Sequence, residues 1–201
     1  MAKVIKSLVL ITPSNTSTTA YTTPADKYAI AKSAVICNYG SVDLTFNLTI
    51  GNVFVATSHT LKAGNTLALN DLDIPLLPGE VINVGTSSLA ITIKVSGFED
   101  DYIANEFPYI KVNASTLNTT AMSVIRDTDV IIRSIIIAAH ASGNRICTIE
   151  APLPIVKQSL NAFDSLILSN LQYYISKSEA LTYKTDSASY RITFIMEKVV
   201  Q

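Results

Sequence analysis

The sequence predicts an all-β protein made of two tandem β-sandwich domains, of the jelly-roll or immunoglobulin-like kind, related by an internal duplication. Three observations carry this prediction. Two blocks of sequence recur in the same order, apolar and polar residues alternate in short runs, and turn residues separate those runs at intervals of about ten residues. The expected boundaries are residues 1–98 for the first domain, 99–108 for a linker and 109–201 for the second domain.

The duplication rests on two ungapped blocks. The segment TTAYTTPADKYAIAKS starts at Thr18 and returns as TTAMSVIRDTDVIIRS from Thr119, 101 positions later. The segment TLKAGNTLALNDLDI starts at Thr60 and lies over SLNAFDSLILSNLQY from Ser159, 99 positions later. Because two long blocks keep the same order, we interpret the chain as two copies of one unit, the second of which has lost two residues between the blocks.

Each copy is expected to consist of strands. Residues 89–97 alternate apolar with polar side chains, and so do residues 190–194, which is typical of half-buried strands. The segment NAFDSLILSNLQYYI of the second copy could form a helix, but its counterpart KAGNTLALNDLDIPL contains Gly64 and Pro75, which disfavour a helix. Turn residues stand at 38–41, 63–65, 78–79 and 141–144.

The composition favours a protein that assembles with others. Charged residues make up 15% of the chain and apolar residues 48%, whereas soluble domains usually have roughly 25% charged residues. Part of the surface is therefore expected to be buried against other subunits, as in a homo-oligomer. The net charge is −1, Lys and Arg are scattered, and no apolar run approaches the length of a membrane span. Neither nucleic acid nor a membrane is expected as a partner.

Residues that could carry chemistry are few and isolated. His59 and His140 each lack a second ligand at metal-binding spacing, and no nucleophile or phosphate-binding motif occurs. Cys37 and Cys147 are outside any CxxC pair and are expected to be thiols. We therefore expect no catalytic residue, no metal and no cofactor, and no enzyme activity. The acidic cluster at residues 99–101 is interpreted as part of a solvated linker.

The run VIIRSIIIAA, residues 130–139, predicts an assembly interface. Regular alternation would place four residues on one face of the strand, namely Ile131, Arg133, Ile135 and Ile137. Because Arg133 is expected to point outward, as is Lys32 in the first copy, three isoleucines would lie outside the core. Each fully buried aliphatic side chain contributes about 1.5–3 kcal/mol. The face is therefore expected to be covered, by the first copy or by a neighbouring subunit.

The first copy resembles a small β-sandwich module of virion proteins in tailed bacteriophages. The matching pieces are Tyr21–Pro24, Ile36–Asn38, Leu61–Thr66, Leu77–Val84 and Ile91–Glu99. The second copy departs from this pattern, since Phe163 replaces the turn glycine and residues 176–178 replace Leu-Pro-Gly. The pattern is structural and carries no catalytic residues, so the resemblance implies a multicopy structural component.

On this resemblance the chain is expected to be a non-enzymatic subunit of a tailed-phage virion, used in capsid decoration or cementing, in the neck, or in the tail or baseplate. Its partners would be other virion proteins and further copies of itself. It would be made in the host cytoplasm, because the N-terminus lacks the apolar run of a signal peptide. One alternative is a carbohydrate- or receptor-binding module on the virion, with its site in the loops at residues 38–42 and 140–145. The others are a bacterial surface or pilus subunit and, least favoured, an enzyme.

Overall fold

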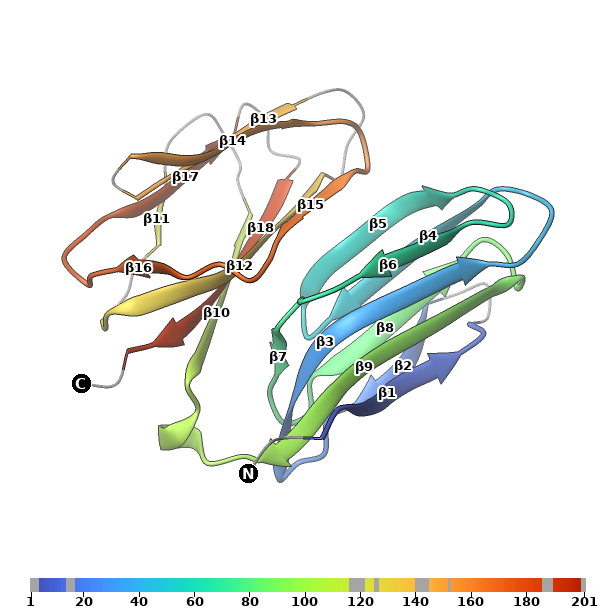
Figure 1. The fold of residues 1–201 in the computed structure, drawn as a ribbon, viewed down its shortest axis with the longest axis horizontal. Coiled ribbons are helices and arrows are strands. Elements are labelled where there is room, and N and C mark those ends of the chain that lie inside the picture. Colours follow the sequence, from blue (N-terminus) through green and yellow to red (C-terminus); the bar gives the residue numbers. More distant parts are fainter. Residues whose placement is uncertain are drawn as a thin grey trace. The chain divides into compact units, whose positions relative to one another are not determined.

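The chain is all-β, as predicted, and folds as two compact units (Figure 1). The computed structural model describes residues 4–13, 17–115, 122–124, 127–139, 145–151, 153–185 and 190–199. The first unit is Met1–Phe107 and the second is Pro108–Gln201. In the described part of the chain, the only element that is not a strand is a single 3₁₀ turn, Ala104–Glu106. No helix in these ranges is long and apolar enough to cross a membrane.

The first unit contains two antiparallel sheets. Sheet A has the strand order β1-β9-β3-β6, with β7 paired to β3, and sheet B has the order β2-β8-β4-β5. The strands are β1 (Lys6–Ile11), β2 (Thr18–Thr22), β3 (Lys27–Asn38), β4 (Leu44–Ile50), β5 (Val53–Leu61), β6 (Thr66–Leu69), β7 (Ile74–Leu76), β8 (Val81–Thr86) and β9 (Ile91–Asp101).

The second unit repeats this strand order. Sheet C has the order β10-β18-β12-β15, with β16 paired to β12, and sheet D has the order β11-β17-β13-β14. The strands are β10 (Tyr109–Ser115), β11 (Met122–Val124), β12 (Val130–Ala139), β13 (Arg145–Glu150), β14 (Pro154–Leu160), β15 (Ser165–Leu168), β16 (Tyr173–Ile175), β17 (Leu181–Thr185) and β18 (Tyr190–Lys198). A duplicated module requires such a match, while the common origin of the two halves stays a prediction.

Alternating side chains build the core of each unit. In β4 the four residues Leu44, Phe46, Leu48 and Ile50 are buried and the polar residues between them point outward. In the second unit, residues of sheets C and D form one core cluster, with Phe194 and Ile137 from sheet C and Ile149 and Leu181 from sheet D. The two sheets of this unit therefore pack face to face around a shared apolar layer.

The segment that resembled a helix folds as strands. Residues 161–164 form a turn, and β15 and β16 follow it, paired side by side along β12. The corresponding first-unit segment forms β6 and β7 along β3. The prediction that this segment forms strands, drawn from Gly64 and Pro75 in the matching first-copy segment, is confirmed. Both segments form two short strands at the same place in their units.

The predicted linker is shorter than expected. Strand β9 continues to Asp101, and Glu99 and Asp101 pair in register with Ala29 and Lys27 of β3. The Lys6 ammonium lies 2.6 Å from the Glu99 carboxylate, and the Tyr21 hydroxyl donates to the same carboxylate at 2.7 Å. The acidic cluster is therefore the end of strand β9, so interpreting it as part of a solvated linker was wrong.

Candidate assembly surface

The alternation of β12 changes at Arg133. The pairing of β12 with β18 shifts register between Ile132 and Ser134, so Arg133 is the extra residue of a β-bulge. Strand β3 has the same irregularity at Lys32, between Ala31 and its next paired residue. One extra residue moves every later side chain of the strand to the opposite face.

The bulge turns two of the predicted interface residues inward. Ile135 and Ile137 are 1% and 0% exposed and belong to the core cluster of their own unit. Ile131 and Arg133 lie outside that cluster, on the other face of the strand. The interpretation that all four residues share an outward face was therefore wrong, because it assumed unbroken alternation. An assembly role for this face stays a prediction.

The outward face of sheet C can be read from the strand register. Ile136 lies beside Ile167 of β15 and Thr193 of β18, while Ile195 lies beside Ser134. Neither Ile167 nor Ile195 is in the core cluster, whereas their chain neighbours Leu168 and Phe194 pack in it or against it. Four isoleucines thus lie outside the core cluster, and we call them the isoleucine face: Ile131, Ile136, Ile167 and Ile195. Ile136 and Ile195 are only 1% and 0% exposed, and Ile131 and Ile167 are half-buried, so this face is largely covered in the structure.

The corresponding face of the first unit is less apolar. Val35 of β3 occupies the place of Ile136, and its register partners are Lys94 of β9 and Ala68 of β6. The matching positions of the two units therefore share one geometry but differ in the chemistry of their outward faces. This difference agrees with the expectation that the second copy has the greater need for a cover.

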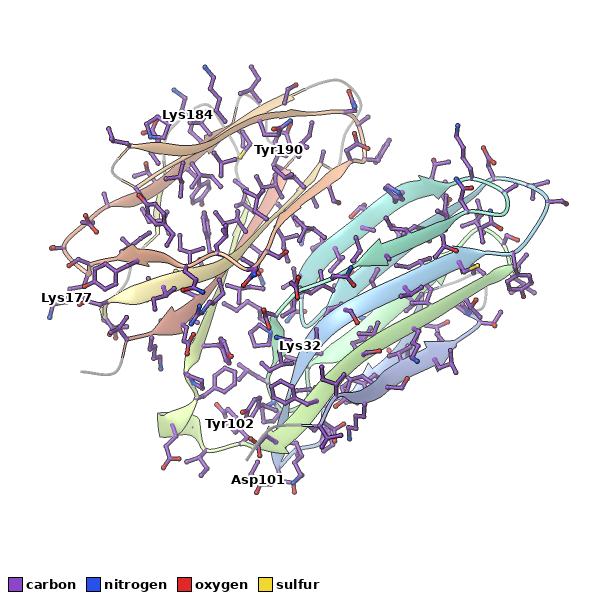
Figure 2. All side chains as sticks on the ribbon, viewed as in Figure 1. Lys32, Asp101, Tyr102, Lys177, Lys184 and Tyr190 are labelled. Carbon is purple, nitrogen blue, oxygen red and sulfur yellow. The ribbon has the colours of Figure 1, made fainter. Side chains whose placement is uncertain are left out.

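The bulge cations are paired. The Arg133 guanidinium donates through Nε to the Glu197 carboxylate at 2.7 Å, with both side chains about one-third exposed. In the first unit, Lys32, which is labelled in Figure 2, forms an ion pair with Asp73. Partly exposed ion pairs contribute at most about 1 kcal/mol. Their consistent role is to hold the cation of each bulge at the sheet surface.

A second apolar surface lies on the loops of the first unit. Tyr39, Val42 and Leu89 are 60%, 62% and 56% exposed, and the Tyr39 hydroxyl donates to the Leu89 carbonyl at 3.0 Å. We call these three residues the apolar loop end. They belong to the β3–β4 and β8–β9 connections, so the hydrogen bond joins two loops that are distant in sequence.

Asn38 holds this loop end in one conformation. Its buried amide donates to the carbonyls of Val42 and Leu61 at 2.9 and 3.0 Å, and its side-chain oxygen accepts from the Gly40 amide at 3.0 Å. A Cβ on Gly40 would lie 2.8 Å from the Ala90 side chain, so glycine permits the close approach of the two loops. The polar group of this loop is therefore used in bracing it, which disfavours the loop as a sugar site. Residues 140–144 of the second predicted loop lie outside the described residues.

The described histidine and cysteine side chains pack against other side chains of their own unit. His59 packs edge-on against Phe46 with ring centroids 5.4 Å apart, and His140 lies outside the described residues. Cys37 is half-buried and Cys147 lies in the core of the second unit. Among the residues that the structure describes, no group of three or more His, Cys, Asp or Glu side chains could hold a metal ion.

The fold defines a class of all-β proteins with two units of like topology, and comparisons with known proteins add structural likenesses. No protein-family model and no curated sequence matches the chain. Its fold is similar to the major capsid protein P2 of bacteriophage PM2, with a TM-score of 0.39, 10% identity and coverage of 100% of this chain and 99% of that one. It is also similar to HutD from Pseudomonas fluorescens SBW25, with a TM-score of 0.33, 8% identity and coverage of 92% and 76%.

A third likeness is to a chain in the structure of the Sulfolobus turreted icosahedral virus, with a TM-score of 0.26, 9% identity and coverage of 98% of this chain and 61% of that one. Identities and TM-scores this low establish neither a family nor a function, so the function is inferred from the chain's own surfaces.

Proposed function

We propose that this chain is a non-enzymatic structural subunit of a virion, and more narrowly of a tailed bacteriophage. In this proposal, duplication of one β-sandwich module produced both units. The chain then assembles with other virion proteins and with further copies of itself. The matching strand order of the two units supports the duplication. The motifs of the first copy, together with a charged fraction of only 15%, support the virion role.

The observation that carries the proposal is the apolar loop end. Loops of soluble proteins are usually polar at their tips, yet Tyr39, Val42 and Leu89 are all more than half exposed. Each large side chain that a neighbour covers would contribute about 1.5–3 kcal/mol. Because Asn38 already braces the loop, little conformational entropy is lost when a partner binds it. A rigid apolar contact of this kind suits a protein whose work is assembly.

A paired set of variants tests the contact. We expect Tyr39→Ser combined with Val42→Ser to weaken incorporation into particles at least tenfold, since both apolar anchors are lost. The matched control is Ile5→Ser, which removes a comparably exposed apolar side chain just before β1. Incorporation is measured by quantitative mass spectrometry of purified particles, and folding by thermal denaturation of the purified chain.

The same experiment can overturn the proposal. If the double variant is incorporated like the wild-type protein, the loop end is not the contact. If the wild-type chain is absent from purified particles, the virion role itself is wrong. An electron cryomicroscopy map that places the chain and counts its copies would decide between capsid decoration, neck, tail and baseplate positions.

A further inference from the structure

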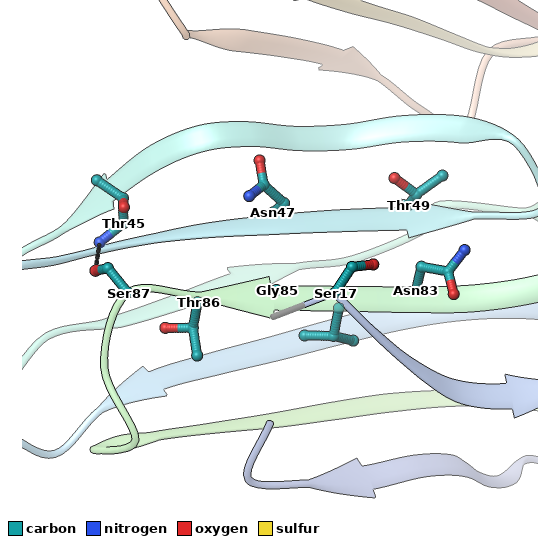
Figure 3. A pocket seen from close by; sticks show the side chains of 9 residues that line it. Ser17, Thr45, Asn47, Thr49, Asn83, Gly85, Thr86 and Ser87 are labelled. Atoms are coloured by element: carbon teal, nitrogen blue, oxygen red, sulfur yellow. Dashed lines mark hydrogen bonds between the residues drawn. The ribbon is translucent and has the colours of Figure 1, made fainter. Parts of the chain in front are cut away.

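A groove of about 400 Å³ lies on the outward face of sheet B in the first unit (Figure 3). Its walls are side chains from two neighbouring strands, with Thr45, Asn47 and Thr49 projecting from β4, and with Asn83 from β8 and Ser87 just after it. Gly85 lies between the last two and forms the floor. The groove owes its depth to this glycine, since alternate residues of both strands point into the same space.

The polar walls are fixed by hydrogen bonds that use their acceptor atoms. The Asn47 side-chain oxygen accepts from the Ser58 amide at 2.8 Å, and the Asn83 side-chain oxygen accepts from the Thr19 hydroxyl at 2.9 Å. The Ser87 hydroxyl oxygen accepts from the Thr45 amide at 2.9 Å. Within the part of the chain that the structure describes, both side-chain NH₂ groups and the Ser87 hydroxyl hydrogen have no acceptor and can donate to a ligand. The groove therefore presents a preorganised set of uncharged donors.

Among the described residues of the second unit, the matching place on sheet D holds only a small hollow. Gly85 pairs with Asn47 across the sheet, and the corresponding pair in sheet D is Lys184 with Thr148. Figure 2 shows Lys184 on the outward side of its unit. The hollow beside Lys184 and Thr148 has a volume of only about 10 Å³. Where the first unit has Gly85, which carries no side chain, the second unit thus has the long cation Lys184 beside a much smaller hollow.

The lining selects a class of ligand. The groove's volume of about 400 Å³ lies within the range of roughly 300–1,000 Å³ for small-molecule sites. Among the described residues that line it, none carries a charge, which disfavours phosphates and acidic sugars. Val84 is the single large apolar residue among them, which disfavours a peptide with apolar anchors. Sugar hydroxyl, ring and acetamido oxygens accept hydrogen bonds from donors spaced along a strand. We propose that this groove binds a neutral saccharide, with acetamido sugars favoured by the two side-chain NH₂ groups.

The substitution Gly85→Thr tests the groove without disturbing the fold. A Cβ at Gly85 meets the Asn47 side-chain nitrogen and the Ser17 backbone at 3.7 Å, an ordinary contact, so a Cβ fits there. The rest of the threonine side chain would take up the space beside Asn47 and Ser17 that a ligand needs. Threonine is also favoured in strands, so the thermal midpoint should be unchanged or higher. The control is Thr92→Val, which removes a hydroxyl from β9 of sheet A instead.

The full-length protein is screened against an array of neutral and acidic oligosaccharides and then titrated with chitotetraose. We expect the wild type and Thr92→Val to bind neutral saccharides and Gly85→Thr to lose at least tenfold in affinity. Binding that persists in Gly85→Thr would place the ligand elsewhere and overturn the proposal. So would a wild-type protein that binds no saccharide, or only acidic ones. The outcome is independent of particle assembly, which the loop-end variants measure.

Discussion

Arg133 and Lys32 occupy the same place in their units, each as the extra residue of a bulge and each paired with a carboxylate. In the sequence, a charged residue at such a position suggests unbroken alternation, with the charge on the solvent-facing side of the strand. In the folded strand it marks the position where the inward and outward faces exchange. The identity of the core residues after it depends on this single position.

Substitution of Ile135 distinguishes the two possible faces. We expect Ile135→Ala to lower the free energy of unfolding by about 2–5 kcal/mol, because the side chain fills the core of the second unit. The matched change Ile131→Ala, on the other face and only partly buried, should lower it by less than about 2 kcal/mol. Urea unfolding monitored for the second unit provides the comparison. Equal losses would argue that the bulge is absent.

The positive φ angle at Gly64 leads to a second prediction about the stability of single-residue variants. Gly64 has φ +70° and open space around it, and its counterpart Phe163 adopts φ +59° at the same turn. An L-residue in this conformation is destabilised by roughly 1–2 kcal/mol. We expect Gly64→Ala to lower the free energy of unfolding by about 1 kcal/mol. The control Gly85→Ala, whose backbone is not left-handed, should be neutral or slightly stabilising. A loss at position 85 matching that at position 64 would contradict this account.

At the scale of elements, strand β9 ties the first unit together through its acidic end. Glu99 of sheet A accepts a hydrogen bond from Lys6 of β1 and another from Tyr21 of β2, a strand of sheet B. The hydrogen bond from Lys6 is the main influence that lowers the pKa of Glu99, against the effect of burial. Burial, and then the bond to Glu99, raises the pKa of Tyr21 above its ordinary value.

These contacts predict a pH dependence of stability. A carboxyl whose pKa is lowered in the folded state stabilises that state above the unfolded pKa of about 4.3, and loses the effect as the pH falls through the folded pKa. We expect Glu99→Gln to reduce the free energy of unfolding by about 0.5–1 kcal/mol at pH 7, allowing for solvent screening. The difference from wild type should shrink below about pH 4. Denaturation across this pH range measures it, and a constant difference would disprove the linkage.

At the scale of the whole molecule, the two units combine one topology with different surfaces. The first has the apolar loop end and the uncharged groove, while the second has the isoleucine face and Lys184 in place of the groove floor. In the proposed function, two units with one topology and different outward faces would present different contacts to a particle. The proposed function, a multicopy assembly protein, predicts such a difference between the surfaces of the two units.

The sequence by itself determined the all-β class, the strands of residues 161–175 and the outward positions of Ile131 and Arg133. Those features depend on local alternation, on turn residues and on a comparison of the two copies. Only the tertiary structure decided that Ile135 and Ile137 enter the core, that Glu99 belongs to a strand, and that a groove lies over Gly85. Each of these features depends on pairing with a strand that is distant in the chain. The sequence of one strand shows neither a shift in its pairing register nor a groove formed over a glycine.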